Sequence, residues 1–378
     1  MPSPVSKRVL HLRSSGGLLG AEQVILGLCQ HSREFGYEPL LALTHDRSDP
    51  VPQLHVAAKA RGIESTLIEC RHRFDPSAFK QLRRLVATSR IDVLHTHGYR
   101  EDFYAVMSRS GATLAATNHL WKRTTPALRF YARADALLLS RFDRVVAVSA
   151  EIQNDMKALG FTAPKLAYIP NGIDLDRFET IDRSEERRRT GRHALGLADE
   201  EFVLATTGSL TEEKGHAFML EALSKAPLRG TETVWLVAGD GPEAEELEQL
   251  ASSWGVADRV RFLGRREDIP ELLGIADAFV LPSLIEGLPM ALLEAMASGL
   301  ACVASAVGDV GRAIEDGISG LLVERSSSSA LGQAVDRVLR DRELRERLAR
   351  NAAKRVREEF SSRRMTQAYC AEYDAATA

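Results

Sequence analysis

The chain has 378 residues, which is more than one ordinary core needs and predicts two domains. Apolar residues make up 44% and charged residues 27%, as in a soluble globular protein, and no apolar run approaches the roughly 20 residues that cross a bilayer. Residues 1–17 hold no apolar signal region followed by a small-residue cleavage site. We therefore expect a cytoplasmic protein without an integral membrane segment.

The net charge of -3 hides an asymmetry along the chain. Residues 1–173 hold 23 Lys and Arg against 15 Asp and Glu, so the remainder is acidic. A basic half favours an anionic partner or surface, although solvated helix faces explain it equally well.

The four cysteines are widely scattered and have no CxxC or CxH spacing: Cys29, Cys70, Cys302 and Cys370. Buried free thiols fit this distribution better than disulfides or metal ligands. We therefore predict no metal site.

Short apolar runs alternate with longer amphipathic stretches in two series. The first series comprises RVLHL, PLLALT, STLIEC, IDVLHTH, ATLAATN, RVVAVS and KLAYIP, and it stops at the turn-rich connector PNGIDLDRF. After the charged stretch RSEERRRTGRHALG, the second series comprises FVLATTGS, VWLVAG, VRFLG, AFVLPS, ACVAS and GLLVE. This alternation predicts two doubly wound α/β domains, residues 1–173 and 174–355, with ligands at the carboxyl ends of the strands. We predict a further helix over residues 356–378, and one position open to it is against the first domain.

The stretch LPSLIEGLPMALLEAMASG, residues 281–299, carries two carboxylates eight residues apart. We predict a strand end near Ser283, a turn with Glu286, and a helix that has Pro289 at its first position. Glu294 then lies roughly 7 to 8 Å along the helix axis from Pro289. Two carboxylates so spaced suit two vicinal diols with an anion at the helix N-terminus between them. Alternatively, Glu286 caps the helix and Glu294 is an ordinary polar helix position.

Two further turns of the second series offer backbone N–H groups. TGSLTEEKG, residues 207–215, adds the Ser209 and Thr211 hydroxyls and the Lys214 ammonium, which suits phosphate oxygens, although it lacks the spacing of an NTPase loop. AGDGPE, residues 238–243, is better explained as a tight turn.

Several predicted strands of the first series are followed by polar loops. SSGGLLGAE, residues 14–22, would let the backbone at Gly16 and Gly17 approach a ligand, or it is a plain strand-to-helix turn. ATNHLWKR ends a strand at His119. LHTHGYRED supplies four candidate acceptor contacts: His95, His97, Tyr99 and Arg100.

Residues 119–142 mix aromatic and basic side chains. This composition suits a helix that touches anionic lipid or a lipid phosphate, and equally an internal helix with a basic outer face. We favour weak contact with the inner face of the membrane, because the whole first half is basic. Nucleic-acid binding is not expected, since no recognised module for it is present.

Together, the motifs GSLTEEKG, AGDGPE, FLGRRED, LPS and EGLPxxLLEAMASG resemble those of the retaining glycosyltransferases of family 4. The loop SSGGLLGAE and the connector PNGID extend the likeness over nearly the whole chain. The resemblance implies the GT-B fold, in which two Rossmann-like domains face each other across a crevice. It also implies a nucleotide-diphosphate sugar as donor and neither a metal ion nor another cofactor.

The resemblance assigns roles to individual residues. Glu286 would contact the hexose hydroxyls, Glu294 the ribose diol and Lys214 the diphosphate. Other positions would hold the base, the phosphates and the sugar: Gly16, Gly17, Gly264, Arg265, Arg266, Gly287, Leu288 and Met290. His119 would lie beside the reacting sugar.

Two positions depart from the family pattern. Ser209 stands where most members have Arg, and Arg312 stands where many have Glu. Arg312, Arg265 or Arg266 could substitute for the missing phosphate cation.

The predicted function is transfer of a hexose, with retention of configuration, from a nucleotide sugar to a glycan or lipid-linked acceptor in polysaccharide or cell-envelope synthesis. A nucleotide-sugar epimerase on the same fold and a non-catalytic sugar-nucleotide-binding protein are the alternatives. The base, sugar and acceptor stay open, because loop shape decides them.

Overall fold

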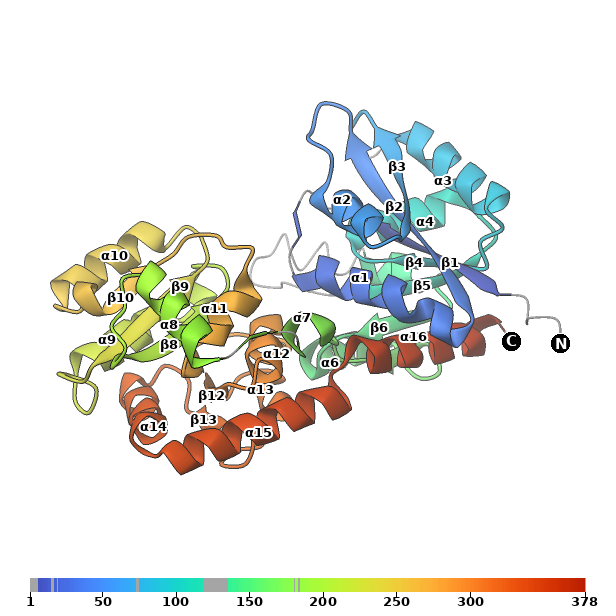
Figure 1. The fold of residues 1–378 in the computed structure, drawn as a ribbon. Coiled ribbons are helices and arrows are strands. Elements are labelled where there is room, and N and C mark those ends of the chain that lie inside the picture. Colours follow the sequence, from blue (N-terminus) through green and yellow to red (C-terminus); the bar gives the residue numbers. More distant parts are fainter. Residues whose placement is uncertain are drawn as a thin grey trace. The chain divides into compact units, whose positions relative to one another are not determined.

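A computed structural model describes residues 6–14, 17–18, 20–72, 75–118, 135–179, 181–182 and 184–377. The chain divides into two compact units (Figure 1). Unit 1 comprises residues up to Ile173 together with those from Ser362 onwards, and unit 2 comprises Asp174–Ser361. The last segment thus belongs to unit 1, but it begins at Ser362 rather than at 356, because the preceding helix runs without a break to Glu359.

Unit 1 is built on a parallel sheet whose strand order reverses between β1 and β4. Such a reversal is where doubly wound folds place their ligands. In spatial order the described strands are β3 (Glu64–Cys70), β2 (Tyr37–Asp46), β1 (Lys7–Arg13), β4 (Val93–Thr96), β5 (Thr113–Asn118), β6 (Arg144–Ala147) and β7 (Leu166–Tyr168).

Both faces of this sheet are apolar, which is why its strands appear as nearly continuous hydrophobic runs. On β2, Leu40 faces one core cluster, with α3 and α4, and Leu41 faces the other, with α1 and α2. The described helices of unit 1 are α1 (Gly20–His31), η1 (Ser32–Phe35), α2 (Gln53–Ala60), α3 (Pro76–Thr88), α4 (Tyr99–Ser108), α6 (Ala150–Ala158) and α16 (Ser362–Thr377).

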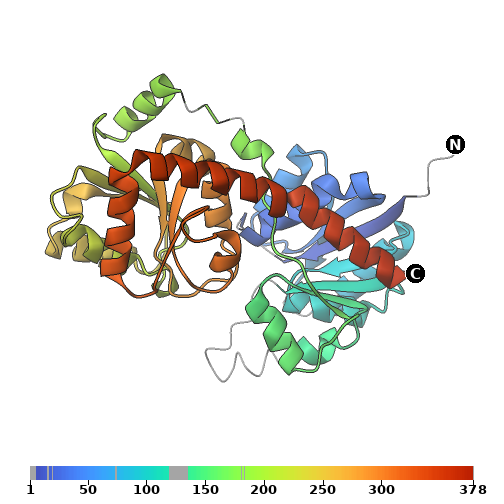
Figure 2. The same cartoon turned by 90° about the horizontal axis from the view of Figure 1, so that it is seen from below.

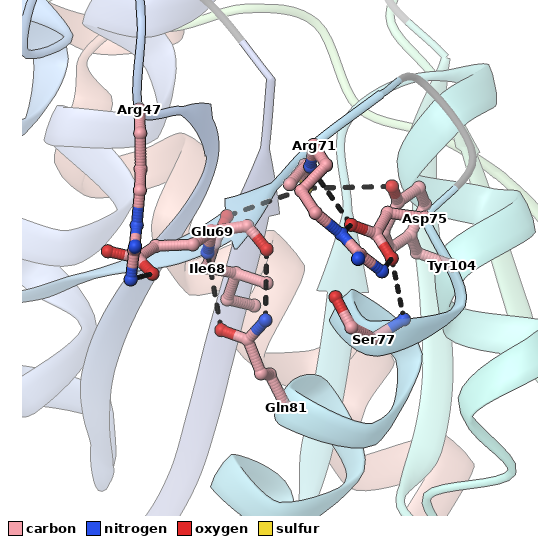
Figure 3. Close-up of polar contacts among 9 residues, drawn as sticks. Arg47, Ile68, Glu69, Arg71, Asp75, Ser77, Gln81 and Tyr104 are labelled. Atoms are coloured by element: carbon pink, nitrogen blue, oxygen red, sulfur yellow. Dashed lines mark hydrogen bonds and ion pairs between the residues drawn. The ribbon is translucent and has the colours of Figure 1, made fainter.

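Helix α3 shows how local sequence sets an element boundary (Figure 3). The carboxylate of Asp75 accepts a hydrogen bond from the Ser77 N–H at 2.8 Å, and Pro76 opens the helix where no donor is needed. The Arg71 guanidinium also bonds to Asp75 and holds the pKa of that carboxyl well below its usual range. Gln81 then ties the helix to the Glu69 carbonyl of β3 at 2.9 Å.

The C-terminal helix α16 lies beside α1 (Figure 1). The Ser362 N–H donates to the Ile173 carbonyl at 2.8 Å, and Gly27 leaves room for the Ser362 side chain at the crossing. Tyr373 bonds through its hydroxyl to His95 at 2.6 Å. This helix is therefore an integral part of unit 1.

Unit 2 repeats the doubly wound arrangement, with its reversal between β8 and β11. In spatial order its strands are β10 (Val260–Phe262), β9 (Thr233–Ala238), β8 (Phe202–Thr207), β11 (Ala278–Leu281), β12 (Ala301–Ser305) and β13 (Leu321–Val323). The α/β fold class expected from the sequence is confirmed in both units.

The helices of unit 2 cover its sheet, and Figure 2 shows the orange-red C-terminal pair, α14 and α15, over one face. Its described helices are α7 (Asp176–Glu179), α8 (Glu185–Ala194), η2 (Glu212–Lys214), α9 (His216–Ser224), α10 (Ala244–Ser253), η3 (Ala257–Arg259), α11 (Ile269–Ile275), α12 (Met290–Ala297), α13 (Val310–Ala313), α14 (Ser328–Arg340) and α15 (Arg342–Glu359).

Two predictions from the sequence, one on the cysteines and one on membrane-spanning segments, can be compared with the structure. All four cysteines are free and buried, as predicted. Among the described residues, no helix is long and apolar enough to cross a membrane.

Candidate functional site

The loops after β8 and β11 meet at the switch point of unit 2, although some 70 residues separate them in the chain. The Glu213 carbonyl accepts hydrogen bonds from the Leu284 N–H at 2.8 Å and the Ile285 N–H at 3.2 Å. These bonds join residues 208–215 to residues 282–289, so that the two predicted motifs form one site.

Gly215 is required by this junction. Its φ is +62°, and an added Cβ would fall 3.3 Å from the Pro282 carbonyl carbon and closer still to the oxygen. A side chain here would push the two loops apart, which explains why glycine follows Lys214 in the motif.

Glu286 is a buried carboxylate, 9% exposed, held by two neighbours. Its Oε1 accepts hydrogen bonds from the Lys214 ammonium at 2.6 Å and from the Ser283 hydroxyl at 2.7 Å. Among the described residues none donates to Oε2. The carboxylate is therefore oriented by protein groups while one oxygen is left for a ligand. The ion pair with Lys214 and the role of Ser283 were not predicted, although Ser283 lies only three residues before Glu286.

Helix α12 begins one residue later than predicted. Pro289 is the N-cap, with ψ of 121°, and its carbonyl accepts the first helical bond from the Leu292 N–H at 3.1 Å. Met290 is therefore the first helical residue and lies half-buried, Leu288 is buried, and the Gly287 carbonyl accepts from the Asp309 N–H at 3.0 Å.

Glu294 lies on α12 and is partly buried. Burial raises the pKa of its carboxyl to about 7, and the charge of Arg177 on α7 opposes the shift. Burial therefore favours the protonated form of this carboxyl more than in an ordinary glutamate.

The remaining donor candidates lie on turns that are joined to one another by backbone hydrogen bonds. The Gly239 N–H bonds to the Gly264 carbonyl at 2.9 Å, and the Leu210 N–H bonds to the Asp240 carbonyl at 3.0 Å. These bonds align the turns after β8, β9 and β10 along one edge of the sheet. Ser209, Gly264 and Arg265 are exposed on them.

The three cations considered as substitutes at the phosphate position differ in their surroundings. Arg266 is engaged by Asp268, with its Nε 2.8 Å from the carboxylate. Arg265 and Arg312 are exposed, the latter on α13. Arg266 is thus paired with a carboxylate in the ligand-free protein.

Unit 1 has a cavity of about 730 Å³ at the carboxyl ends of β1 to β5. Three of the four predicted acceptor residues line it: His97, Tyr99 and Arg100. Arg100 is half-buried and lies over the Tyr104 ring, 5.5 Å from its centroid. Gly17 is described and half-buried, whereas Gly16, His119 and most of the segment 119–142 lie outside the described residues.

His95 is not among the residues that line this cavity, and its role as an acceptor contact stays a prediction. It is fully buried, and its ring nitrogens bond to the Tyr373 hydroxyl at 2.6 Å and the Thr117 hydroxyl at 2.7 Å. His95 lies within β4 and bonds to Tyr373 of α16, whereas His97 lies one residue beyond the end of that strand.

Among the described residues, His11, His95 and His97 bring ring nitrogens within 4.8 Å of one another, an arrangement that a metal ion could use. The His11 Nδ1 and His97 Nε2 atoms are 3.1 Å apart. Hydrogen bonds among rings and hydroxyls engage these histidines except at His11 Nε2, which has no partner among the described residues. The sequence did not reveal the cluster, because His11 lies on β1 whereas His95 and His97 lie on and just after β4.

Two buried carboxyls on the first turn of α4 were also not predicted. Glu101 and Asp102 both line the cavity, and burial raises the pKa of each. The nearby carboxyl of Asp135 raises that of Asp102 further, while Arg13 lowers that of Glu101.

The fold and the switch-point site define the class of protein. The solved structure of Anabaena HepE in complex with UDP and glucose aligns with a TM-score of 0.82 at 22% identity, over 98% of this chain and 100% of that one. Two Rossmann-like units with this neighbour place the chain among proteins of the GT-B fold.

Sequence comparisons identify the family. Residues 187–355 match the model of the glycosyl transferases group 1, and residues 19–177 match that of glycosyltransferase family 4. The D-inositol 3-phosphate glycosyltransferase of Actinosynnema mirum is 33% identical over 75% of this chain and 72% of its own length. The alpha-D-kanosaminyltransferase of Streptomyces kanamyceticus is 38% identical, over 50% of this chain and 48% of its own length. The chain belongs to the group 1 glycosyltransferases of family 4.

Proposed function

We propose that the protein transfers a hexose, with retention of configuration, from a nucleotide-diphosphate sugar to a glycan or glycolipid acceptor. The observation that carries this proposal is the carboxylate of Glu286, fixed by Lys214 and Ser283 with Oε2 left to a ligand. It lies at the switch point of unit 2, where an open α/β sheet binds its ligand.

The donor would occupy the carboxyl edge of the unit 2 sheet. Glu286 Oε2 would accept a sugar hydroxyl, and Glu294 would accept the ribose diol from α12. Lys214 would turn from Glu286 toward the diphosphate, whose leaving charge it stabilises more in the transition state than in the ground state. In this scheme the leaving phosphate oxygen takes the acceptor proton, and no metal ion or other cofactor takes part.

The acceptor would enter the cavity of unit 1. Its lining combines the cation of Arg100, the ring of Tyr99 and buried carboxyls, which suits a polar glycan end. One relative is named for an inositol phosphate, so a phosphorylated acceptor is included in the test.

A cytoplasmic location and a role in polysaccharide or cell-envelope synthesis complete the proposal. Weak contact of residues 119–142 with the inner face of the membrane stays a prediction from composition, because residues 119–134 lie outside the described part of the chain.

Replacing Glu286 tests the function directly. Glu286→Gln should lower donor turnover about 100-fold, because a neutral amide loses the charge that Lys214 and Ser283 orient, while affinity for the free nucleoside diphosphate changes less than threefold. The measurement is nucleoside-diphosphate release, after thermal-shift screening of UDP, GDP, ADP and their sugars. Proton NMR of the product then reads the anomeric configuration.

Glu271→Gln is the matched control, since Glu271 is exposed on α11. Equal losses of turnover and nucleotide affinity in Glu286→Gln would contradict the sugar-binding role. A new sugar nucleotide formed without acceptor would indicate an epimerase. Donor binding with no release across glycan, glycolipid and phosphorylated acceptors would indicate a non-catalytic protein.

A further inference from the structure

A second turn also contacts the Glu286 turn. Residues 307–309 follow β12, and Gly308 has a φ of +50° there. A Cβ added at Gly308 would lie 2.8 Å from the Glu286 carbonyl carbon, 3.1 Å from the Gly287 carbonyl oxygen, and nearest to the Glu286 carbonyl oxygen. The peptide that joins Glu286 to Gly287 therefore rests directly on the backbone of Gly308.

This contact is reinforced by a hydrogen bond, and the loop after β8 makes further backbone bonds to the same turn. The Asp309 N–H donates to the Gly287 carbonyl at 3.0 Å, while the Glu213 carbonyl accepts from Leu284 and Ile285. The Glu286 turn is thus fixed between two loops through backbone atoms, which have no alternative rotamers. Neither set of contacts involves Glu294, which lies further along on α12.

We infer that Gly308 is a positioning residue of the donor site: its lack of a side chain places the Glu286–Gly287 peptide, and with it the carboxylate that meets Lys214 and Ser283. This inference rests on the proposed function, because the donor is what that carboxylate binds. A methyl group at Gly308 has to displace the peptide, since backbone atoms cannot rotate away. A catalytic group misplaced by about 1 Å costs about 100-fold in rate.

The test compares three glycines of the full chain. Gly308→Ala combines the clash with an unfavourable φ. Gly317→Ala measures the φ effect alone, because Gly317 has φ of +71° and nothing within 4 Å of an added Cβ. Gly311→Ala adds a methyl near the same turn without a positive φ, at 3.9 Å from the Leu322 side chain.

We expect Gly308→Ala to lower kcat/KM for the nucleotide sugar about 100-fold, mostly through kcat. Affinity for the free nucleoside diphosphate, measured by calorimetry, should stay within about threefold, because Glu294 keeps its place. Gly317→Ala and Gly311→Ala should keep kcat/KM within about threefold of the wild type. A merely structural role would instead lower the melting temperature of Gly308→Ala and Gly317→Ala together, with the kinetics of the folded fraction unchanged, and that result would overturn the inference.

Amide hydrogen exchange of the wild-type protein tests whether residues 307–309 hold the Glu286 turn, even if Gly308→Ala does not fold. The Asp309 amide should be protected and should exchange together with the Leu284 and Ile285 amides, because all three hydrogen bonds open when the Glu286 turn moves away from its neighbouring loops. An Asp309 amide that exchanges as fast as a free peptide would overturn the inference. By contrast, a protected amide in a wild-type protein that transfers no sugar would contradict the proposed function and leave the positioning contact standing.

Discussion

At the scale of single residues, the carboxyl of Glu294 links ligand binding to pH. Its pKa is about 7 in the ligand-free protein because it is buried, whereas accepting two ribose hydroxyls favours the ionised form. Affinity for a nucleotide sugar should therefore fall as the pH drops from 8 toward 5, by up to about tenfold per pH unit below 7. Calorimetric titration with a nucleotide sugar measures this, because its diphosphate diester does not titrate in that range.

Glu294→Gln is the control, since its affinity should be weaker and independent of pH. The stability of the folded protein should change with pH in the opposite direction to donor affinity. A carboxyl with a raised folded-state pKa destabilises the folded protein fully above that pKa, and this cost shrinks as the pH falls from about 7 toward the unfolded pKa. Glu294→Gln should thus raise the melting temperature at pH 8 more than at pH 5. Equal shifts at both pH values would contradict the assignment.

The sequence predicted which residues gather at the site better than it predicted their partners. Glu286 and Lys214 follow from motif spacing, but their ion pair depends on the bonds that join the loops after β8 and β11. His95 and His97 lie two residues apart, yet His95 lies within β4 and bonds to Tyr373 of α16, whereas His97 follows the end of the strand and lines the cavity. Gly308 has no motif signal, because its role depends on a neighbour 22 residues earlier in the chain.

At the scale of elements, helix α8 carries almost no apolar surface and is held by two arginines. Arg188 and Arg192 bond to the two carboxylate oxygens of Asp277 at 2.6 and 2.7 Å, just before β11. The Val203 N–H adds a third bond to Asp277 at 2.8 Å. Sequence reasoning recognised a charged helix here, but the partner that anchors it lies 85 residues away from Arg192.

Asp277→Asn should lower the stability of unit 2 by about 3 kcal/mol, because it leaves the buried Arg192 without its counter-charge. Urea unfolding followed by the fluorescence of Trp235, in the core of the same unit, measures this change. Arg189→Ala, which removes an exposed arginine from the same helix, should change it by less than about 0.5 kcal/mol. Similar midpoints for Asp277→Asn and the wild type would show that α8 is held by other contacts.

At the scale of the whole molecule, hydrophobic alternation was enough to predict two doubly wound sheets, because buried parallel strands have a strong pattern. It could not place the last helix, since α16 has an amphipathic pattern that fits many surfaces. The position of α16 is determined by hydrogen bonds from its polar side chains. Tyr369 and Tyr373 bond to Thr117 and His95, and Asp374 bonds to the Tyr37 hydroxyl at 2.9 Å.

A chain that ends at Ser361 should therefore lose unit 1 and keep unit 2. Removing α16 uncovers the apolar face of α1 and takes away the Tyr373 and Tyr369 hydroxyls that bond to the buried side chains of His95 and Thr117. Calorimetry of the truncated chain should show one unfolding transition fewer than the full chain, while nucleoside-diphosphate binding by unit 2 remains. Tyr373→Phe, which keeps the packing and removes one hydroxyl, should cost only about 1 kcal/mol. If the truncated chain kept every transition, α16 would be an appendage rather than part of the unit 1 core.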